Sequence, residues 1–316
     1  MGHQGSVVRT SSWGSRDLAG QPGDSLFDID LPFTTTTQNG VASTTKTVTA
    51  VAVARALEEK GLSLDTKVAP YLPAPWTKHP SMLTVTFRQL LHHDGLKHPG
   101  SICDTDPYEC LKDAVALGMT ASPGYNNIHY TVMRVILPFL SDPTGMTTLF
   151  ETETDGAKLN EAFSQSFRTY VRDVLHDGGV NSDFAYTSDN VALHYSFGPP
   201  PSGDWIEADN DSQAYLFAGS GGLKATAPQL ARFLTEFDAG NVVSPAMVKA
   251  LKDGNLGFDN QNGWTSPTTP ALGPLHSKNG GAAGLSSQLV ILPSGVQAFL
   301  TATGLGPLPA AAGGSS

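Results

Sequence analysis

A serine and a lysine stand three residues apart at the start of an apolar stretch of the chain. In the tetrapeptide Ser43-Thr44-Thr45-Lys46 the two residues share one face of a helix, so the Lys46 amine can reach the Ser43 hydroxyl. A hydroxyl with a base beside it is what covalent acyl transfer requires. Burial and the partial positive charge of a helix N-terminus both favour the neutral, proton-accepting amine. The spacing therefore predicts a nucleophile and its base. The alternative is that Ser43 caps the helix and Lys46 is a solvated residue of its first turn.

A cluster of histidines offers a different chemistry. His92, His93, Asp94 and His98 crowd into one segment, which makes a metal site conceivable. Their spacing matches no standard zinc motif, so we expect no metal there.

A second rival is a glycine-rich segment around Ser220. Residues 218–222 read Ala-Gly-Ser-Gly-Gly, and Asp238 and His276 follow in the order that α/β-hydrolases use. That motif needs a preceding parallel strand and an alternation of strands and helices, and neither is evident here. We interpret the segment as a turn before the next helix.

The two cysteines, Cys103 and Cys110, lie in one loop that contains Asp and Pro. A local disulfide is sterically allowed and would indicate an oxidising compartment, whereas two reduced thiols are the alternative. A metal site built on both would need further ligands nearby, and none is visible.

The elements that position Ser43 are helices between two groups of strands. The helix over residues 43–60 is apolar on nearly every face, which predicts that it is buried. Further helical patterns, separated by loops rich in Pro and Gly, lie at residues 87–92, 127–139, 159–175 and 228–237.

Strand patterns lie near both ends of the chain. Val7-Val8 and residues 26–29 come first, and residues 286–292 and 296–303, joined by a Pro-Ser-Gly turn, come last. The sequence therefore predicts an α+β fold of the α/β sandwich type, with an antiparallel sheet formed from both chain ends and flanked by helices. We expect residues 1–60 and 241–316 to form this sheet domain and residues 61–240 a mainly helical domain. The active site should lie between them.

Composition and charge exclude several classes of function. The chain has 316 residues and a formal net charge of −10, which argues against binding to nucleic acid or to anionic membrane surfaces. The most apolar stretch, residues 132–140, is too short to span a membrane and is broken by Arg134 and Pro138. The N-terminus has neither a basic region nor an apolar core. The expected location is cytoplasmic if the chain is full length, and periplasmic or secreted if a signal peptide was removed.

Several stretches, in order and separation, resemble one known family. They are residues 42–46, 61–65, 71–73, 84–96, 221–227 and 230–233. On these the chain resembles the serine β-lactamase and penicillin-binding superfamily, in particular the branch with class C β-lactamases, D-Ala-D-Ala carboxypeptidases and β-lactamase-like esterases.

The resemblance implies a second motif, Tyr-x-Asn, which Tyr125-Asn126-Asn127 matches. Tyr125 would relay protons if adjacent lysines lower its pKa. Asn127 would orient Lys46 and hydrogen-bond a substrate carbonyl. Ser188-Asp189-Asn190 matches an element of class A enzymes but lies much farther from Ser43 than that class places it, so we interpret it as a turn.

The resemblance also implies a third motif on an edge strand, Lys278-Asn279-Gly280, followed by Gly281. Lys278 would supply positive charge near the Tyr125 oxygen and near a substrate carboxylate. The small residues Gly280 and Gly281 would let the substrate backbone lie against the strand. The backbone N–H groups of Ser43 and Gly281 would form the oxyanion hole.

These residues together predict a serine hydrolase that works through an acyl-enzyme on Ser43 without a metal or an organic cofactor. A carboxylesterase-like activity is preferred. The alternatives are a β-lactamase, a D-Ala-D-Ala carboxypeptidase or D-aminopeptidase, an acyltransferase and, in another class, a non-catalytic ligand-binding homologue. The expected partner is a small-molecule ester, β-lactam or D-amino-acid peptide, and the sequence leaves the oligomeric state open.

Overall fold

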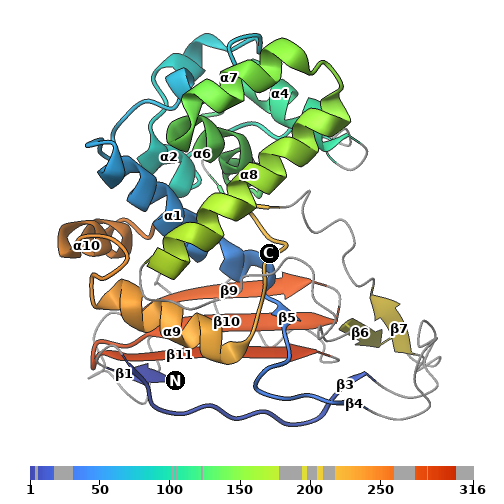
Figure 1. Cartoon of the computed structure of the whole chain (residues 1–316), viewed down its shortest axis with the longest axis vertical. Coiled ribbons are helices and arrows are strands. Elements are labelled where there is room, and N and C mark those ends of the chain that lie inside the picture. The colour runs from blue at the N-terminus through green and yellow to red at the C-terminus, as the bar shows by residue number, and fades with distance from the viewer. Residues whose placement is uncertain are drawn as a thin grey trace.

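Strands from the two ends of the chain pair in one antiparallel sheet. The computed structural model describes residues 1–3, 6–17, 31–100, 103, 106–121, 124–177, 194–197, 205–208, 218–259, 275–282 and 284–303. The strand order is β2-β1-β11-β10-β9, so β9 lies at an edge of the sheet (Figure 1). The α+β prediction is confirmed. The expected strand at residues 26–29 and the Ser188-Asp189-Asn190 turn lie outside the described residues.

The register joins the first residues of the chain to the last strand. Strand β1 (Gly2–His3) pairs with β2 (Ser6–Val7) on one side and with β11 (Val296–Thr303) on the other, where Gly2 lies opposite Gln297. Strand β10 (Leu285–Ile291) runs between β11 and β9 (His276–Ala282). The shorter pairs are β3 (Ser15–Asp17) with β4 (Leu31–Pro32), β5 (Asn39–Gly40) with β8 (Lys224–Ala225), and β6 (His194–Phe197) with β7 (Trp205–Ala208).

Helix α1 (Thr45–Glu59) begins directly after a short 3-10 turn, η1 (Ala42–Thr44). Twelve of its 15 residues are buried, as its apolar sequence predicts. The helix ends in a Schellman motif, in which Leu62 N–H donates to Leu57 O at 2.8 Å and Gly61 N–H to Glu58 O at 2.9 Å. Gly61 accommodates the left-handed backbone of this motif, with φ at +66°.

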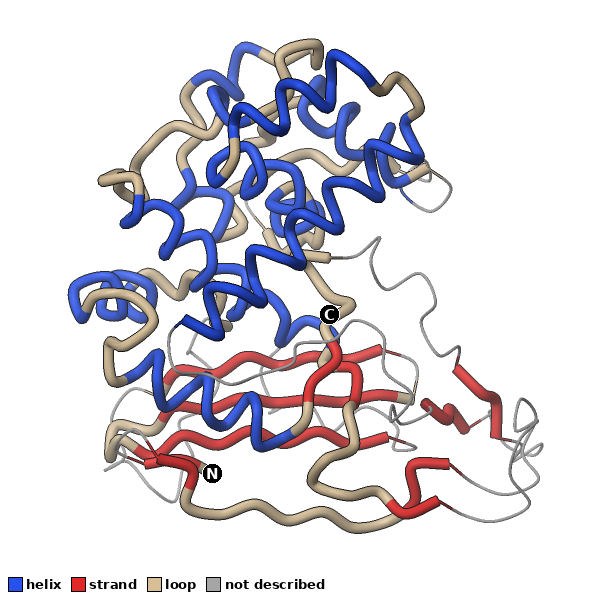
Figure 2. The backbone as a smooth tube through the Cα atoms, viewed as in Figure 1, coloured by secondary structure: helices blue, strands red, loops and turns tan. Residues whose placement is uncertain are grey.

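The helices between α1 and α8 bury a common core with α1, and α6 and α8 contact α1 directly (Figure 2). The predicted helix over residues 127–139 is divided at Val132, although the Val132 backbone stays right-handed helical. Thr86 and Gln89 form a capping box that starts α2, and the Asp106 carboxylate caps α4. The elements are η2 (Ala69–Tyr71), η3 (Pro80–Leu83), α2 (Phe87–Leu91), α4 (Pro107–Leu117), α5 (Ile128–Thr131), α6 (Met133–Ser141), α7 (Pro143–Thr152) and α8 (Gly156–Asp177).

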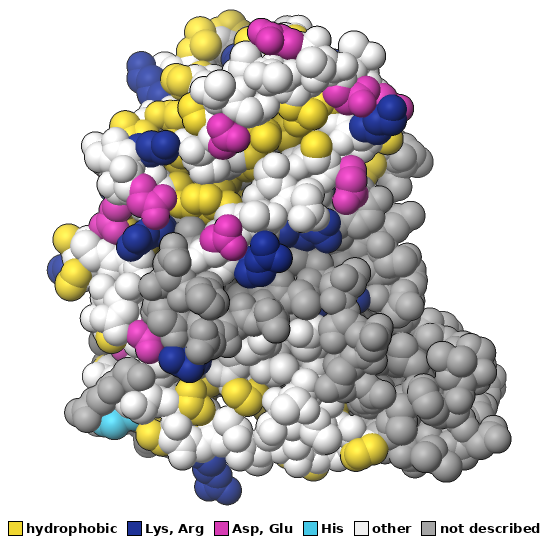
Figure 3. Space-filling model, in the orientation of Figure 1, with side chains coloured by type: hydrophobic (Ala, Val, Ile, Leu, Met, Phe, Trp, Pro, Cys, Tyr) yellow, Lys and Arg dark blue, Asp and Glu magenta, His cyan; other side chains and the backbone are white. Residues whose placement is uncertain are grey.

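Helix α9 (Ala227–Asp238) lies across the sheet and contacts β1, β2 and β11, and α10 (Pro245–Asp253) follows it. The expected division into two domains at residues 60 and 241 stays a prediction. On the face shown in Figure 3, acidic and basic side chains are interspersed over the helical part.

Cys103 and Cys110 form a disulfide with a Cα–Cα distance of 4.7 Å, which decides between the two alternatives left open by the sequence. Among the described helices, none is long and apolar enough to cross a membrane.

Candidate active site

Ser43 lies in the tight turn that precedes α1. Ala42, just before it, adopts a left-handed backbone with φ at +43°, which is uncommon for a residue with a Cβ atom. The turn is tied to the sheet, because Ser287 of β10 donates to Val41 O at 2.7 Å and its Oγ lies 2.7 Å from Thr44 Oγ1. A strained residue held by contacts on both sides fixes the direction of the Ser43 side chain.

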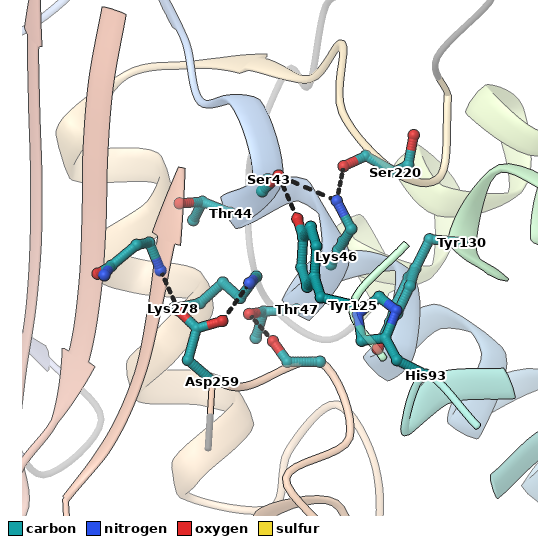
Figure 4. A network of polar contacts seen from close by, with 12 residues as sticks. Ser43, Thr44, Lys46, Thr47, His93, Tyr125, Tyr130, Ser220, Asp259 and Lys278 are labelled. Carbon is teal, nitrogen blue, oxygen red and sulfur yellow. Dashed lines mark hydrogen bonds and ion pairs between the residues drawn. The ribbon is translucent and has the colours of Figure 1, made fainter. Parts of the chain in front are cut away.

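The amine of Lys46 lies 3.0 Å from Ser43 Oγ, as the sequence spacing predicts (Figure 4). Lys46 is fully buried, and its Nζ also lies 2.7 Å from Asn127 Oδ1 and 2.7 Å from the Ser220 backbone oxygen. A neutral amine has two hydrogens and one lone pair. Because Asn127 and Ser220 offer only acceptors here, they use the two hydrogens, and the lone pair is left for the Ser43 hydroxyl.

The charge state of Lys46 follows from its surroundings. Burial is the main cause that lowers its pKa, and the positive charge of Lys278 lowers it further, while Asp259 acts in the opposite direction. The resulting pKa of Lys46 is about 6. At neutral pH the amine is therefore mostly unprotonated and can accept a proton from Ser43.

The Tyr125 hydroxyl lies 2.7 Å from Ser43 Oγ, on another side of it from Lys46. Desolvation raises the Tyr125 pKa, and nearby Asp259 raises it further, while the hydrogen bond to Ser43 opposes both. The condition stated for proton relay, a Tyr125 pKa lowered by adjacent lysines, is therefore not met. Lys46 is mostly neutral at neutral pH, and Lys278 is paired with Asp259. Tyr125 keeps its proton at neutral pH and is poised to donate it.

A neutral histidine supports the Tyr125 ring. The centroid of the His93 ring lies 4.6 Å from that of Tyr125 and 5.0 Å from that of Tyr130. Burial is the main cause, and His129 the next, that lowers the His93 pKa to about 3, so the ring is uncharged. No group of three or more His, Cys, Asp or Glu side chains in the described ranges is arranged to hold a metal.

Lys278 forms an ion pair with Asp259, which sequence reasoning missed. Its side chain is only 4% exposed, and its Nζ lies 4.9 Å from the centroid of the Tyr125 ring. The second oxygen of Asp259 accepts the Asn279 backbone N–H at 2.7 Å. No motif spacing links Asp259 to Lys278, because the two meet only when the segment after α10 folds against β9.

At Gly280, strand β9 passes directly beside η1, the turn that contains Ser43. A Cβ atom there would lie 2.3 Å from Val41 O, 2.4 Å from Ser287 Oγ and 3.0 Å from Ser43 N, so only glycine permits this approach. A Cβ atom on Gly281 would meet nothing within 4 Å among the described atoms. Strand β9 therefore borders open space at Gly281, among the described atoms.

With this geometry in place, comparisons with known proteins place the chain in a family. Residues 2–306 match the profile of the family described as Beta-lactamase. The chain belongs to the Beta-lactamase family. It is also similar, at 25% identity over 228 residues, to the probable fimbrial assembly protein FimD, serogroup H1, of Dichelobacter nodosus. That match covers 66% of this chain and 50% of the relative, so the chain spans about half the length of the curated relative it matches.

Solved structures of the same superfamily share the fold of this Beta-lactamase family member. The octameric penicillin-binding protein homologue from Pyrococcus abyssi superposes with a TM-score of 0.66 at 19% identity, over 96% of this chain and 68% of that one. The D-amino acid amidase from Ochrobactrum anthropi SV3 gives a TM-score of 0.62 at 15% identity, over 88% and 79%. At these identities the likeness shows the fold alone. The family and its neighbours support a serine hydrolase in general.

The structure of this Beta-lactamase family member brings most of the predicted site residues together. Ser43, Lys46, Tyr125 and Asn127 form one hydrogen-bonded group, and Lys278 lies against the Tyr125 ring.

The rival residues serve other roles in the described part of the chain. The Ser220 backbone oxygen accepts from Lys46, and the Asp238 carboxylate contacts Lys252 and Gln297. The His276 ring packs edge-on against Phe258.

Proposed function

We propose that this chain is a serine hydrolase that cleaves carboxylic esters through an acyl-enzyme on Ser43. The observation that carries the proposal is the Lys46 amine, which lies 3.0 Å from Ser43 Oγ with a pKa of about 6. A buried lysine that is neutral at neutral pH and faces a hydroxyl is the arrangement that turns an alcohol into a nucleophile. A lysine that only stabilised the fold would gain nothing from this placement.

In the first half-reaction, Ser43 Oγ attacks the carbonyl carbon while its proton passes to Lys46 Nζ. The tetrahedral oxyanion is held by the backbone N–H groups of Ser43 and Gly281. When the bond to the leaving oxygen breaks, Tyr125 Oη gives its proton to that oxygen. Tyr125 then recovers a proton from Lys46, which returns to the neutral amine.

In the second half-reaction, water attacks the acyl-Ser43 carbonyl and loses a proton to the same relay. The bond from carbon to Ser43 Oγ breaks, Oγ regains a proton from Lys46, and the carboxylic acid leaves. Asn127 supports both steps, because its Oδ1 accepts from Lys46 at 2.7 Å and keeps the lone pair of the amine directed at Ser43.

We favour esters over β-lactams as the substrates because of the contacts that Lys278 makes. Rapid β-lactam turnover needs a dedicated deacylation apparatus, and β-lactams carry a carboxylate that needs an available cation. Lys278, the residue expected to meet that carboxylate, is already paired with Asp259.

Amide cleavage is the second candidate, favoured by the protonation state of Tyr125. An amine leaving group must gain a proton to depart, and the raised pKa of Tyr125 keeps one available. The structural neighbour from Ochrobactrum anthropi SV3 is a D-amino acid amidase, which makes D-amino acid amides the amides to test first.

The test compares wild-type protein with Ser43→Ala on p-nitrophenyl acetate, p-nitrophenyl butyrate, nitrocefin and D-phenylalanine amide. Ser141→Ala, at the end of α6, is the matched control. Loss of ester turnover in Ser43→Ala alone, together with loss of labelling by a fluorophosphonate probe, supports the proposal. Fast nitrocefin turnover would make the protein a β-lactamase. Wild-type protein that is inert to all four substrates and to the probe would favour a non-catalytic homologue.

A further inference from the structure

The cation beside the proposed active site is neutralised from within the chain. Lys278 is almost completely buried and its ammonium group pairs with the Asp259 carboxylate. A buried ammonium group that already has a close carboxylate partner binds a second carboxylate weakly, because the two negative charges would repel each other. This bears on which substrates the proposed hydrolase accepts, and it rests on the proposed function.

Asp259 is held in place by contacts on two sides. Its backbone N–H donates to Ser277 O at 2.7 Å, and its second carboxylate oxygen accepts the Asn279 N–H at 2.7 Å, so it is fixed to β9. Two residues earlier, the Gly257 oxygen accepts from Thr47 Oγ1 of α1 at 2.5 Å. The carboxylate is therefore a built part of the site and not a side chain that happens to lie near it.

Among the described residues, the charges of Lys46, Lys278 and Asp259 consequently sum to about zero at neutral pH. Lys46 is mostly neutral, and Lys278 and Asp259 cancel each other. The Asp259 side chain is 33% exposed whereas that of Lys278 is 4% exposed, so the accessible member of the pair is the negative one. An approaching ligand meets a carboxylate before it meets an ammonium group.

The leaving group should lie on this side of the site. In the proposed mechanism Tyr125 donates its proton to the leaving oxygen, and the Lys278 amine lies 4.9 Å from the centroid of the Tyr125 ring. A charge carried by the leaving alcohol would therefore lie close to the Lys278–Asp259 ion pair. The acyl group lies on the other side of the carbonyl.

We infer that Asp259 selects the leaving group: the site accepts neutral and positively charged alcohols and rejects those that carry a carboxylate. A carboxylate would have to displace Asp259 from Lys278 and remain beside it. A permanently charged cation, in contrast, would be attracted by the Asp259 carboxylate, whose side chain is 33% exposed. Asp259 thus determines specificity without taking part in bond breaking.

Three acetate esters with closely similar leaving groups test the inference. The alcohols are meta-hydroxybenzoate, meta-tert-butylphenol and meta-(trimethylammonio)phenol, which carry a negative, a neutral and a positive group at the same ring position. All three give the same acetyl-enzyme, so kcat/KM reports the step in which the leaving group is still bound. Each value is divided by the rate of the same ester with hydroxide, which removes differences in chemical reactivity.

In wild-type protein we expect the normalised kcat/KM of the anionic ester to be at least about tenfold lower than that of the neutral ester, because the carboxylate is repelled by Asp259. In Asp259→Asn the ratio of anionic to neutral ester should rise by at least about tenfold, because Lys278 is then uncovered. In Lys278→Gln the ratio of cationic to neutral ester should rise, because Asp259 loses its partner. Ratios within one variant do not depend on how much of it is folded.

Equal ratios in wild-type protein and Asp259→Asn would overturn the inference, and so would a wild-type preference for the anionic ester. Either result leaves ester hydrolysis by Ser43 intact. Wild-type protein that cleaves none of the three esters would overturn the proposed function, and this inference with it. The two failures are therefore distinguishable in a single set of measurements.

Discussion

Replacing Lys278 by glutamine tests whether charge, in addition to burial, sets the ionisation of Lys46. Burial is the main cause that lowers the Lys46 pKa to about 6, and Lys278 lowers it further. In the proposed mechanism ester cleavage needs the neutral Lys46 amine, so kcat/KM should rise with pH through about 6 and then level off. Glutamine keeps a polar side chain without the charge. The rising limb should therefore move to higher pH in Lys278→Gln.

The size of this shift in the Lys46 pKa can be worked out from the distances of the two lysine nitrogens to the Tyr125 ring. The Lys46 and Lys278 nitrogens lie 5.0 Å and 4.9 Å from its centroid, so they are at most 9.9 Å apart. At an effective dielectric constant of about 20, two unit charges about 10 Å apart repel by about 1.7 kcal/mol. Removing that repulsion raises the Lys46 pKa by about one. Asp259→Asn removes a charge that raises the Lys46 pKa. The rising part of the pH profile of this variant should therefore move to lower pH.

The assay is kcat/KM for p-nitrophenyl acetate from about pH 4.5 to about pH 9 at constant ionic strength, with buffer hydrolysis subtracted. Lys60→Gln, at the exposed C-terminal end of α1, is the matched control and should keep the wild-type limb. A limb that stays in place or moves to lower pH in Lys278→Gln would refute the reasoning. Movement in the same direction in Lys278→Gln and Asp259→Asn would do so too, because their charges have opposite signs.

Three further predictions follow from single features. Tyr125→Phe should lower kcat/KM for esters by about 100-fold or more, because the proton donor is lost, while thermal unfolding is unchanged. Gly280→Ala should lower the free energy of unfolding by about 1–3 kcal/mol, since its Cβ would lie 2.3 Å from a backbone oxygen. Gly281→Ala, where the structure leaves room, should be as stable as wild-type protein in the same urea titration. Replacing Cys103 and Cys110 together by serine should cost about 2 kcal/mol of unfolding free energy and leave ester turnover unchanged, as differential scanning calorimetry and the ester assay would show.

The parts of the site that obey local rules could be predicted from the sequence. The contact between Ser43 and Lys46 follows from helical spacing alone, and the sheet built from both chain ends follows from strand patterns at 286–303 and near residue 7. Tyr125 and Lys278 were predicted from a family resemblance, and the structure places Tyr125 beside Ser43 and Lys278 against the Tyr125 ring.

The remainder depends on contacts that no spacing encodes. Asp259 reaches Lys278 only through the pairing of its own backbone with β9. The raised pKa of Tyr125 could not be predicted, because the sequence showed two lysines but neither the burial that neutralises Lys46 nor the carboxylate that pairs with Lys278. The state of Cys103 and Cys110 stayed open because it depends on how the loop before α4 folds.

The wide separation of the site residues along the chain has a consequence for synthesis on the ribosome. Ser43 is translated 82 residues before Tyr125, and Lys46 is translated 174 residues before the backbone oxygen that accepts from its amine. Until those later segments pack around it, the Lys46 amine is solvated and holds its proton as an ordinary lysine does. The nascent chain therefore carries a protonated Lys46, and in the proposed mechanism Ser43 gains its base only after the segment around Ser220 has packed against that amine.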